Sequence, residues 1–402
     1  MLRNWAFNIS VGKTADAVRK RMNALNRECL DSEVQKFCID AAFSCPGICL
    51  MDFSKVKPII RQVFCTLRCE LEILQDYADD PAVTEVMVNG PGSIFVERFG
   101  RIEKIDLCFE NKEQLEHVIR RLAASVGREI NDLNPIVDAR LSDGSRVNAV
   151  NSNIAINGPI LTIRKFAKTR LTMEDLIASG SISREASDYV IKLVESSYNI
   201  FISGGTSSGK TTFLNILSDY IPSSERLIVI EDSAELQIRN HENLVRMEAK
   251  AANAQGKGAV SIKDLIKTSL RMRPDRIIVG EVRGAEVIDM ISAMSTGHDG
   301  SLSTGHSNSC IGMIRRLEAM FLSESSFPLE AVQGQIAEGI EIMIHLERDS
   351  KGIRRICEIN EFCGYENGEP LMNELFKYDI QKGLYRTENQ LKKNGKLLRN
   401  QA

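Results

Sequence analysis

The chain has 402 residues, of which 43% are hydrophobic and 26% charged, and its formal net charge at pH 7 is -3. This length exceeds the usual size of one hydrophobic core, so we expect about two or three domains. The composition excludes a fibrous or disordered chain, and the slightly acidic balance argues against nucleic acid as the main partner.

The first residues are basic, but no apolar segment with a small-residue cleavage site follows them, so a signal peptide is not expected. No run of the sequence approaches the roughly 20 apolar residues that cross a bilayer. We therefore expect a cytoplasmic protein that has no integral membrane segment and that contacts the membrane through partners.

Ten cysteines are scattered along the chain, which is typical of reduced thiols rather than of a disulfide framework. Two pairs, Cys45 with Cys49 and Cys65 with Cys69, have helical spacing and leave a four-thiolate zinc site open as an alternative. Zinc sites more often use tighter spacers in turns, so we favour small buried hydrophobes on helices.

An N-terminal helical region is predicted over residues 1–79. From Thr14 to about Asp79 the apolar positions recur at helical spacing, and Pro46 and Pro58 divide the pattern into about three helices. No chemical motif occurs in this region.

A small α+β domain is predicted over residues 80–166. Alternating runs at 83–88 and 93–98 indicate a β-meander, 111–130 has helical periodicity, and strands resume near 140–141, at 146–150 and at 160–165. A polar, basic stretch follows, so we place an interdomain linker at residues 167–175.

A larger α/β domain is predicted over residues 176–378. Strand-like runs at 199–203, 226–231 and 276–281 alternate with helices that begin near Lys210, Ser261 and Gly284. This alternation indicates a parallel sheet covered by helices. Residues 379–402 are polar and basic, and we interpret them as a solvated C-terminal tail.

A phosphate-binding loop occurs between the first of these strands and its helix. Residues 204–211 fit the pattern G-x-x-x-x-G-K-[ST], in which backbone N–H groups surround phosphate oxygens, the lysine neutralises phosphate charge and the last hydroxyl reaches Mg²⁺. We therefore predict ATP and Mg²⁺ as cofactors, with Thr211 at the metal. The predicted nucleotide-binding residues of this loop are Gly204, Gly205, Thr206, Ser207, Ser208, Gly209, Lys210, Thr211 and Thr212.

Carboxylates end the next two strands. The run 226–231 leads into Glu231, Asp232 and Glu235, and the run 276–281 ends in Glu281. Ligands collect at the carboxyl edge of a parallel sheet, where a carboxylate can orient a water molecule or bind the shell of a metal. Gly- and Ser-rich residues 297–306 then contain His298 and His306, either of which could sense the γ-phosphate or bridge subunits.

Arginines flank these motifs. Phosphoryl transfer needs positive charge beyond the P-loop lysine, and an arginine from another domain or subunit can supply it. The candidates for nucleotide binding are Arg140 and Arg146 in the small domain and Arg271 and Arg283 around the second acidic strand.

The four motifs in this order resemble the type II/type IV secretion ATPase superfamily. Residues 134–150 and 270–284 in particular resemble its CpaF/TadA-like branch, which powers assembly of tight-adherence (Flp-type) pili. The resemblance implies an α/β fold in which a RecA-like P-loop ATPase domain is preceded by a small PAS-like α+β domain, joined by a flexible linker in a ring of six subunits.

The same resemblance implies roles for single residues. Glu231, Glu235 and Glu281 would form the acidic catalytic set, His306 would lie nearest the nucleotide, and Arg140 and Arg146 would sense phosphate. Inner-membrane platform proteins of the pilus are the implied partners of such a motor. One departure is Ser233, which stands where the type II secretion branch has a proline.

Other functions remain open at this point. A motor for type IV secretion of protein or DNA and a pilus retraction motor share the ATPase core. A small-molecule P-loop kinase would need an acceptor pocket and a lid, and a non-hydrolysing nucleotide-binding scaffold would not need Lys210, Thr211 and Glu281 together.

Overall fold

The computed structural model describes residues 2–25, 27–46, 48, 50–166, 170–239, 241–250, 252, 257–349 and 352–400, with side chains from residue 11 onward. The chain divides into two compact units, Met1–Thr169 and Arg170–Ala402. Within the described ranges no helix is long and apolar enough to cross a membrane.

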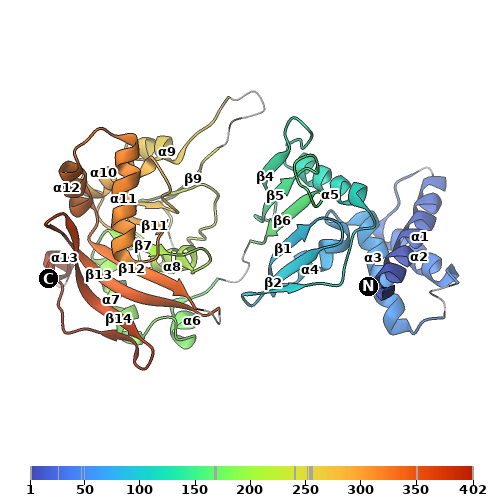
Figure 1. Cartoon of the computed structure of the whole chain (residues 1–402), viewed down its shortest axis with the longest axis horizontal. Coiled ribbons are helices and arrows are strands. Elements are labelled where there is room, and N and C mark those ends of the chain that lie inside the picture. Colours follow the sequence, from blue (N-terminus) through green and yellow to red (C-terminus); the bar gives the residue numbers. More distant parts are fainter. Residues whose placement is uncertain are drawn as a thin grey trace. The chain divides into compact units, whose positions relative to one another are not determined.

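Three helices open the first unit, as the periodicity predicts (Figure 1). Val18, Val34, Ile59 and Val63 are buried where they pack together. The bounds are α1 Leu2–Ala24, α2 Asp31–Ser44 and α3 Phe53–Arg68, followed by η1 Glu72–Leu74 and α4 Gln75–Asp79.

The prediction that Pro58 breaks this region is wrong, because Pro58 lies inside α3. A proline inside a helix costs about 3 kcal/mol. Val56, Ile59 and Val63 are fully buried on the same helix, and each contributes roughly 1.5–3 kcal/mol on burial, which offsets that cost. Pro46, in contrast, follows the end of α2.

An antiparallel sheet forms the rest of the first unit, and α5 packs on it through Leu115, Val118 and Leu122. In the described residues the strand order is β3-β2-β1-β6-β5-β4. The bounds are β1 Val83–Asn89, β2 Ile94–Arg98, β3 Arg101–Lys104, α5 Lys112–Ser125, β4 Ile136–Arg140, β5 Arg146–Val150 and β6 Ile160–Arg164. The predicted meander, helix and later strands are confirmed.

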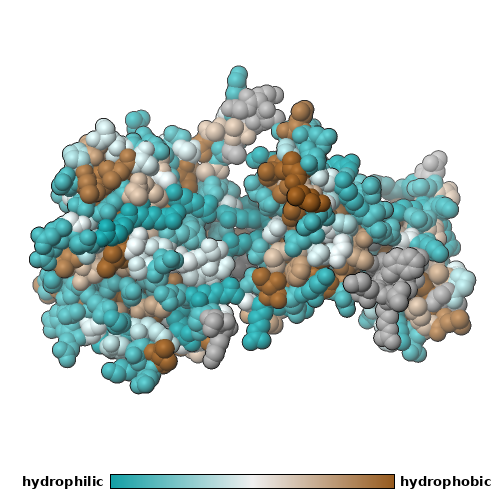
Figure 2. Space-filling view, viewed as in Figure 1, coloured by the Kyte–Doolittle hydropathy of each residue, from teal (hydrophilic) through white to brown (hydrophobic). Residues whose placement is uncertain are grey.

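One end of this sheet has a surface of large apolar side chains. Leu133 and Ile156 are 90% and 102% exposed, and Ile136 and Ile154 are more than half exposed. The backbone N–H of Asn151 donates to the carbonyl of Pro135, which brings the two loops to the same sheet end. Figure 2 shows hydrophobic residues gathered near β4, and exposed patches of this kind mark interaction sites.

The second unit is built on one large sheet whose strands β12-β7-β11-β10-β8-β9 are parallel neighbours, as predicted. An antiparallel ribbon, β13-β14-β15, extends the sheet beyond β12. The strand bounds are β7 Ile200–Gly204, β8 Leu227–Glu231, β9 Leu244–Glu248, β10 Arg276–Val279, β11 Leu302–His306, β12 Ile342–Arg348, β13 Arg354–Glu366, β14 Glu369–Asp379 and β15 Gly383–Arg386.

Helices cover both faces of this sheet, because neighbouring residues of the buried strands point to opposite sides. Ile200 and Ile202 of β7 pack with α7 and α8, whereas Phe201 packs with α10, α11 and α12. The helix bounds are α6 Met173–Ala178, α7 Arg184–Glu195, α8 Lys210–Ser218, α9 Ile262–Ser269, α10 Glu286–Ser295, α11 Cys310–Glu324, α12 Leu329–Gly339 and α13 Gly395–Asn400.

The predicted linker lies partly outside the described residues, since residues 167–169 are not among them. Of the rest, residues 173–175 already form the first turn of α6, where Thr172 caps the helix by accepting from the N–H of Asp175. The helix therefore begins inside the predicted linker.

The interpretation of residues 379–402 as a solvated tail is wrong. Glu361 is 1% exposed, and its carboxylate accepts from the backbone N–H groups of Lys392 and Lys393 at 2.8 and 2.7 Å. Lys396 lies 2.6 Å from Glu341, and Tyr198 donates to the carbonyl of Lys393. Hydrogen bonds to the backbone and ion pairs of Lys396 with Glu341 and Asp299 thus hold the C-terminal segment on the second unit.

Candidate nucleotide site

The P-loop joins the end of β7 to the first residue of α8, as predicted. Gly209 has φ +99° and is the N-cap of α8, and a Cβ on Gly204 would collide with the carbonyl oxygen of Leu346. Ser207 is left-handed at φ +57°, in a region that non-glycine residues seldom adopt. Sterics therefore require glycine at both ends of the loop.

The loop has the chemistry of an anion site. The first turn of α8 contains no acidic residue, and its N–H groups carry the positive end of the helix dipole. Lys210 is 7% exposed. Gly205, Thr206 and Ser207 are exposed at the apex of the loop, Ser208 is buried, and Thr211 and Thr212 belong to the first turn of α8. These residues fit the phosphates of a nucleotide.

A magnesium ion would fit only together with those phosphates. Among the described residues, no group of three or more His, Cys, Asp or Glu side chains could hold a metal ion. Magnesium is usually bound by one or two protein groups, water and substrate phosphates, so the hydroxyl of Thr211 beside the P-loop suits it.

A chain of contacts runs from the P-loop lysine to the second acidic strand. Lys210 Nζ donates to the carbonyls of Gly204 and Gly205 at 3.1 and 2.9 Å, and it lies 3.2 Å from His306 Nδ1. His306 Nε2 lies 2.7 Å from Glu281 Oε1. Because an ammonium group only donates, Nδ1 of His306 accepts, and the ring proton is on Nε2. Nε2 contacts Oε1 of Glu281 without the geometry of a hydrogen bond. The structure thus brings together Lys210, His306 and Glu281.

Charge and burial set the state of this chain. Burial lowers the pKa of His306, and the neighbouring Lys210 lowers this pKa further, although Glu281 acts in the opposite direction. Arg283 donates to the other oxygen of Glu281 at 2.6 Å, a hydrogen bond that raises the pKa of the guanidinium. His306 is therefore neutral near pH 7 and joins a cation to an anion.

Glu231 occupies a different position from Glu281. It is 3% exposed, and Oε1 accepts from the backbone N–H groups of Glu235 and Leu236 at 2.8 and 2.9 Å. Burial raises the pKa of Glu231, and these two hydrogen bonds act in the opposite direction. Glu231 therefore fixes the turn that carries Glu235.

Some predicted residues are not brought to this site. Arg271 follows α9 and precedes β10, and His298 precedes β11, so both lie at the amino ends of strands whose carboxyl ends form the site. Between the two histidines the structure selects His306.

Arg140 and Arg146 lie in the first unit as register partners on β4 and β5. Arg140 donates to the carbonyl of Gly144 at 3.4 Å, and its guanidinium lies 5.9 Å from the ring centre of Phe166. Their contact with nucleotide stays a prediction.

Two contacts around the P-loop were not foreseen. Arg354 of β13 donates to the carbonyl of Ser207 at 2.9 Å. Ser203, directly before the loop, lies 2.9 Å from Nδ1 of the buried His345 on β12. Neither residue belongs to a sequence motif, so pattern alone carries no signal for them.

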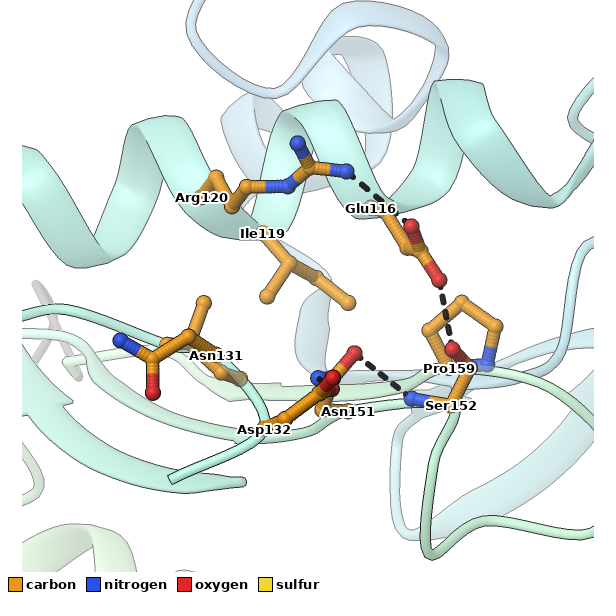
Figure 3. Close-up of a pocket in the computed structure, with 9 residues that line it drawn as sticks. Glu116, Ile119, Arg120, Asn131, Asp132, Asn151, Ser152 and Pro159 are labelled. Atoms are coloured by element: carbon orange, nitrogen blue, oxygen red, sulfur yellow. Dashed lines mark hydrogen bonds and ion pairs between the residues drawn. The ribbon is translucent and has the colours of Figure 1, made fainter. Parts of the chain in front are cut away.

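A polar cavity of about 310 Å³ lies in the first unit between α5 and the loops after β5. Figure 3 shows Glu116 and Arg120 above Asp132, Asn151 and Ser152. Ser152 donates to Glu116 at 2.6 Å, and Asn151 donates to Asp132 at 3.2 Å. The polar groups of this cavity bind one another, and none of the predicted site residues lines it.

The alternative of a zinc site includes Cys49, which lies outside the described residues. Cys65 is buried on α3, and burial, with Cys69 beside it, raises the pKa of the Cys65 thiol to about 12. The buried position of Cys65 on α3 agrees with the interpretation as a small hydrophobe on a helix.

Comparison with known proteins agrees with this site. Residues 69–373 match the family model described as "Type II/IV secretion system protein". A putative conjugal transfer protein of Mycobacterium tuberculosis is 34% identical over 293 residues, which cover 71% of this chain and 83% of that protein. The type IV secretion system protein VirB11 of Brucella suis is 32% identical over 319 residues, covering 72% and 88%.

A solved structure shares the fold. The Legionella pneumophila ATPase DotB is 21% identical, with a TM-score of 0.51, and the match covers 70% of this chain and 78% of DotB. The second unit has the RecA-like arrangement of a P-loop on a parallel sheet, as predicted. With a family match over most of its length and a complete P-loop site, this chain belongs to the type II/IV secretion system protein family and is an ATPase.

Proposed function

We propose that this chain is the motor ATPase of a tight-adherence (Flp-type) pilus-assembly machine, in which a ring of six subunits couples Mg-dependent ATP hydrolysis to movement of pilin. The supporting observation is that the two stretches resembling the CpaF/TadA-like branch form the elements with candidate site residues. Residues 134–150 form the β4–β5 hairpin, and residues 270–284 contain β10 and lead through Glu281 to Arg283.

Lys210 changes partners in this proposal. It donates to two P-loop carbonyls and contacts His306. Phosphate oxygens are charged and accept more strongly than a neutral carbonyl or imidazole, so the nucleotide draws Lys210 toward its phosphates. His306 then loses the donor at Nδ1 and becomes able to sense that the phosphates have arrived.

Glu281 orients the attacking water in this proposal. It is partly exposed, it follows a parallel strand, and His306 and Arg283 hold its two oxygens. Magnesium, when bound with ATP beside Thr211, supplies positive charge to the phosphate oxygens. Glu235 is the neighbouring acid, and Glu231 positions it through backbone hydrogen bonds.

Assembly into a ring supplies the remaining positive charge. Arg140 and Arg146 sense the phosphates from the small domain, and Arg271, at the far end of β10, reaches only a nucleotide held by another subunit. The exposed Leu133 and Ile156 suit a surface that is covered in an assembly. We place the motor in the cytoplasm, bound to inner-membrane platform proteins of the pilus.

Replacement of Lys210 by alanine in native cells tests this function. We expect purified Lys210→Ala protein to lose ATP binding, because Lys210 is the one lysine of the P-loop and its ammonium group neutralises phosphate charge. Electron microscopy of the cells, with protein level checked, should show loss of thin pili. Unchanged or more abundant pili would instead indicate a retraction motor or another cargo.

The second candidate function is a type IV secretion motor for protein or DNA. It is favoured by the 34% identity to a putative conjugal transfer protein and the 32% identity to VirB11. In the same Lys210→Ala cells, loss of plasmid transfer with normal pili would support this candidate. Wild-type protein that binds ATP without releasing phosphate would point to a scaffold.

A further inference from the structure

The β12–β13 hairpin touches the P-loop at its apex. Arg354, the first residue of β13, donates from Nε to the carbonyl of Ser207 at 2.9 Å. A Cβ on Gly209 would lie 3.4 Å from Cδ of Arg354, so the arginine stem covers the loop at its last glycine as well.

The carbonyl of Ser207, which accepts from Arg354, belongs to the Ser207–Ser208 peptide, and the orientation of this peptide matters for phosphate binding. Because the peptide bond is planar, a donor that fixes the carbonyl of Ser207 also fixes the direction of the N–H of Ser208. Ser207 has φ +57°, a left-handed conformation that a residue with a Cβ seldom adopts. The hydrogen bond from Arg354 therefore stabilises a strained peptide in the middle of the loop.

The hairpin that presents Arg354 is tied to the same sheet as the P-loop. Leu346 of β12 is the parallel register partner of Gly204. At the turn, the N–H of Asp349 donates to the carbonyl of Ile353 at 2.9 Å, and the carboxylate of Asp349 pairs with Arg355. Arg354 thus stands at a fixed place relative to the loop.

A cavity of about 290 Å³ adjoins the loop on the side of Arg354. Its walls include Gly209, Thr212 and Phe213 from the P-loop and α8, Leu176 from α6, and Leu346 and Arg354 from the hairpin. Apolar walls beside the P-loop suit the flat, weakly polar base of a nucleotide whose phosphates the loop binds.

We propose that Arg354 is a positioning residue for ATP hydrolysis. It fixes the direction of the Ser208 N–H, which donates to the carbonyl of Gly205 at 3.4 Å here and is offered to phosphate when nucleotide binds. Its side chain forms, together with Gly209 of the loop, one wall of the cavity that takes the nucleoside half of the substrate. Arg354 lies outside every motif of the proposed site, and its role rests on ATP being the substrate.

Three substitutions at this position separate the hydrogen bond from the charge. Arg354→Gln keeps an N–H at the place of Nε without the charge. Arg354→Lys keeps the charge but has a methylene where Nε donates, and Arg354→Met removes both the charge and the donor at similar volume. Arg386→Met is the matched control, since Arg386 on β15 pairs with Glu185, lies over the ring of Tyr189 and does not line this cavity.

The probes are Mg-ATP and inorganic tripolyphosphate, which has the phosphates without base and ribose. We expect Arg354→Met to bind both probes about tenfold more weakly, the size of one lost charge-assisted hydrogen bond, and Arg354→Gln to stay near wild type. Arg386→Met should bind tripolyphosphate normally. Melting temperatures, KM and kcat are measured on the same full-length samples.

Two outcomes would overturn the proposal. The first is wild-type tripolyphosphate affinity in Arg354→Met, and the second is rescue by Arg354→Lys but not by Arg354→Gln, which would assign the effect to charge. Absence of phosphate release from the wild-type protein would count against the proposed function instead. The two binding measurements would still test Arg354 in that case.

Discussion

Replacing Glu281 by glutamine should remove turnover and leave the fold intact. Glutamine keeps the shape of the side chain and can accept from Arg283, but it cannot take a proton from water. Loss of a general base typically lowers kcat by about 10²–10⁴-fold, so we expect a fall of roughly 10³-fold, or about 4 kcal/mol in the barrier. ATP affinity should stay close to wild type, because Lys210 and the P-loop backbone are unchanged.

The stability cost of this change is small by comparison. The ion pair of Glu281 with Arg283 lies at the surface, where the arginine side chain is 55% exposed. Surface pairs contribute about 0–1 kcal/mol, and 1 kcal/mol corresponds to roughly 2–4 °C in Tm for a unit of this size, so this is the largest shift expected. A large loss of kcat with a small shift in Tm is therefore the expected signature.

Steady-state phosphate release and binding of a fluorescent ATP analogue measure the two effects. Asp232→Asn is the control, because Asp232 lies 3.5 Å from the same guanidinium but does not contact His306. This control should keep kcat within about threefold of wild type, as expected for an exposed pair. A kcat of Glu281→Gln close to that of wild type would refute the assignment of Glu281.

Three further predictions concern the stability of the fold and the binding of nucleotide. Burial lowers the pKa of His345, and the pKa of His306 is lowered too. The unfolded chain therefore binds protons below about pH 6.5 that the folded chain does not bind, so stability falls as pH falls from 7.5 to 5.5. The loss of Tm over this range should be smaller in His345→Gln, and an equal loss would contradict the reasoning. Glu361→Ala leaves the backbone N–H groups of Lys392 and Lys393 unpaired, which should cost about 3 kcal/mol in unfolding free energy. Denaturant unfolding measures that cost, and unchanged resistance of the C-terminal segment to limited proteolysis would argue against its anchoring. Gly204→Ala places a methyl group against the carbonyl of Leu346, so weaker nucleotide binding is expected in a binding assay, and wild-type affinity would show that the loop can shift.

The P-loop and the acidic strand ends could be predicted because their signals are local. Gly204, Lys210 and Glu281 each follow an apolar strand, and the parallel sheet brings such strand ends to one edge. The preference for His306 over His298 rested on the family resemblance alone, because the residue pattern does not separate the two histidines. The residues of β11 that decide between them, Leu302–His306, include Ser, Thr and Gly and do not look like a buried central strand.

The antiparallel ribbon was missed for a different reason. In β13 the polar residues Asn360 and Glu361 are buried beside Phe362, and the register shifts between Ile359 and Asn360. A bulge and buried polar side chains together remove the period of two on which strand prediction depends.

The C-terminal segment was misjudged because its backbone N–H groups bind a buried carboxylate, in addition to the side-chain contacts of Lys396. The polarity of a sequence reflects its side chains and carries no information about contacts of the backbone. Lysine side chains can face water while their N–H groups serve a buried carboxylate.

The position of β7 between β11 and β12 has a consequence for variation among relatives. His306 and Leu346 are both register partners of Gly204 in the parallel ladder. One residue inserted within β11 would move His306 by about 3.3 Å along the strand and turn it to the opposite face. Insertions and deletions should therefore fall in the connections at the amino ends of these strands. Within β7, β11 and β12, the number of residues from the first paired residue to the carboxyl end of the strand should stay constant.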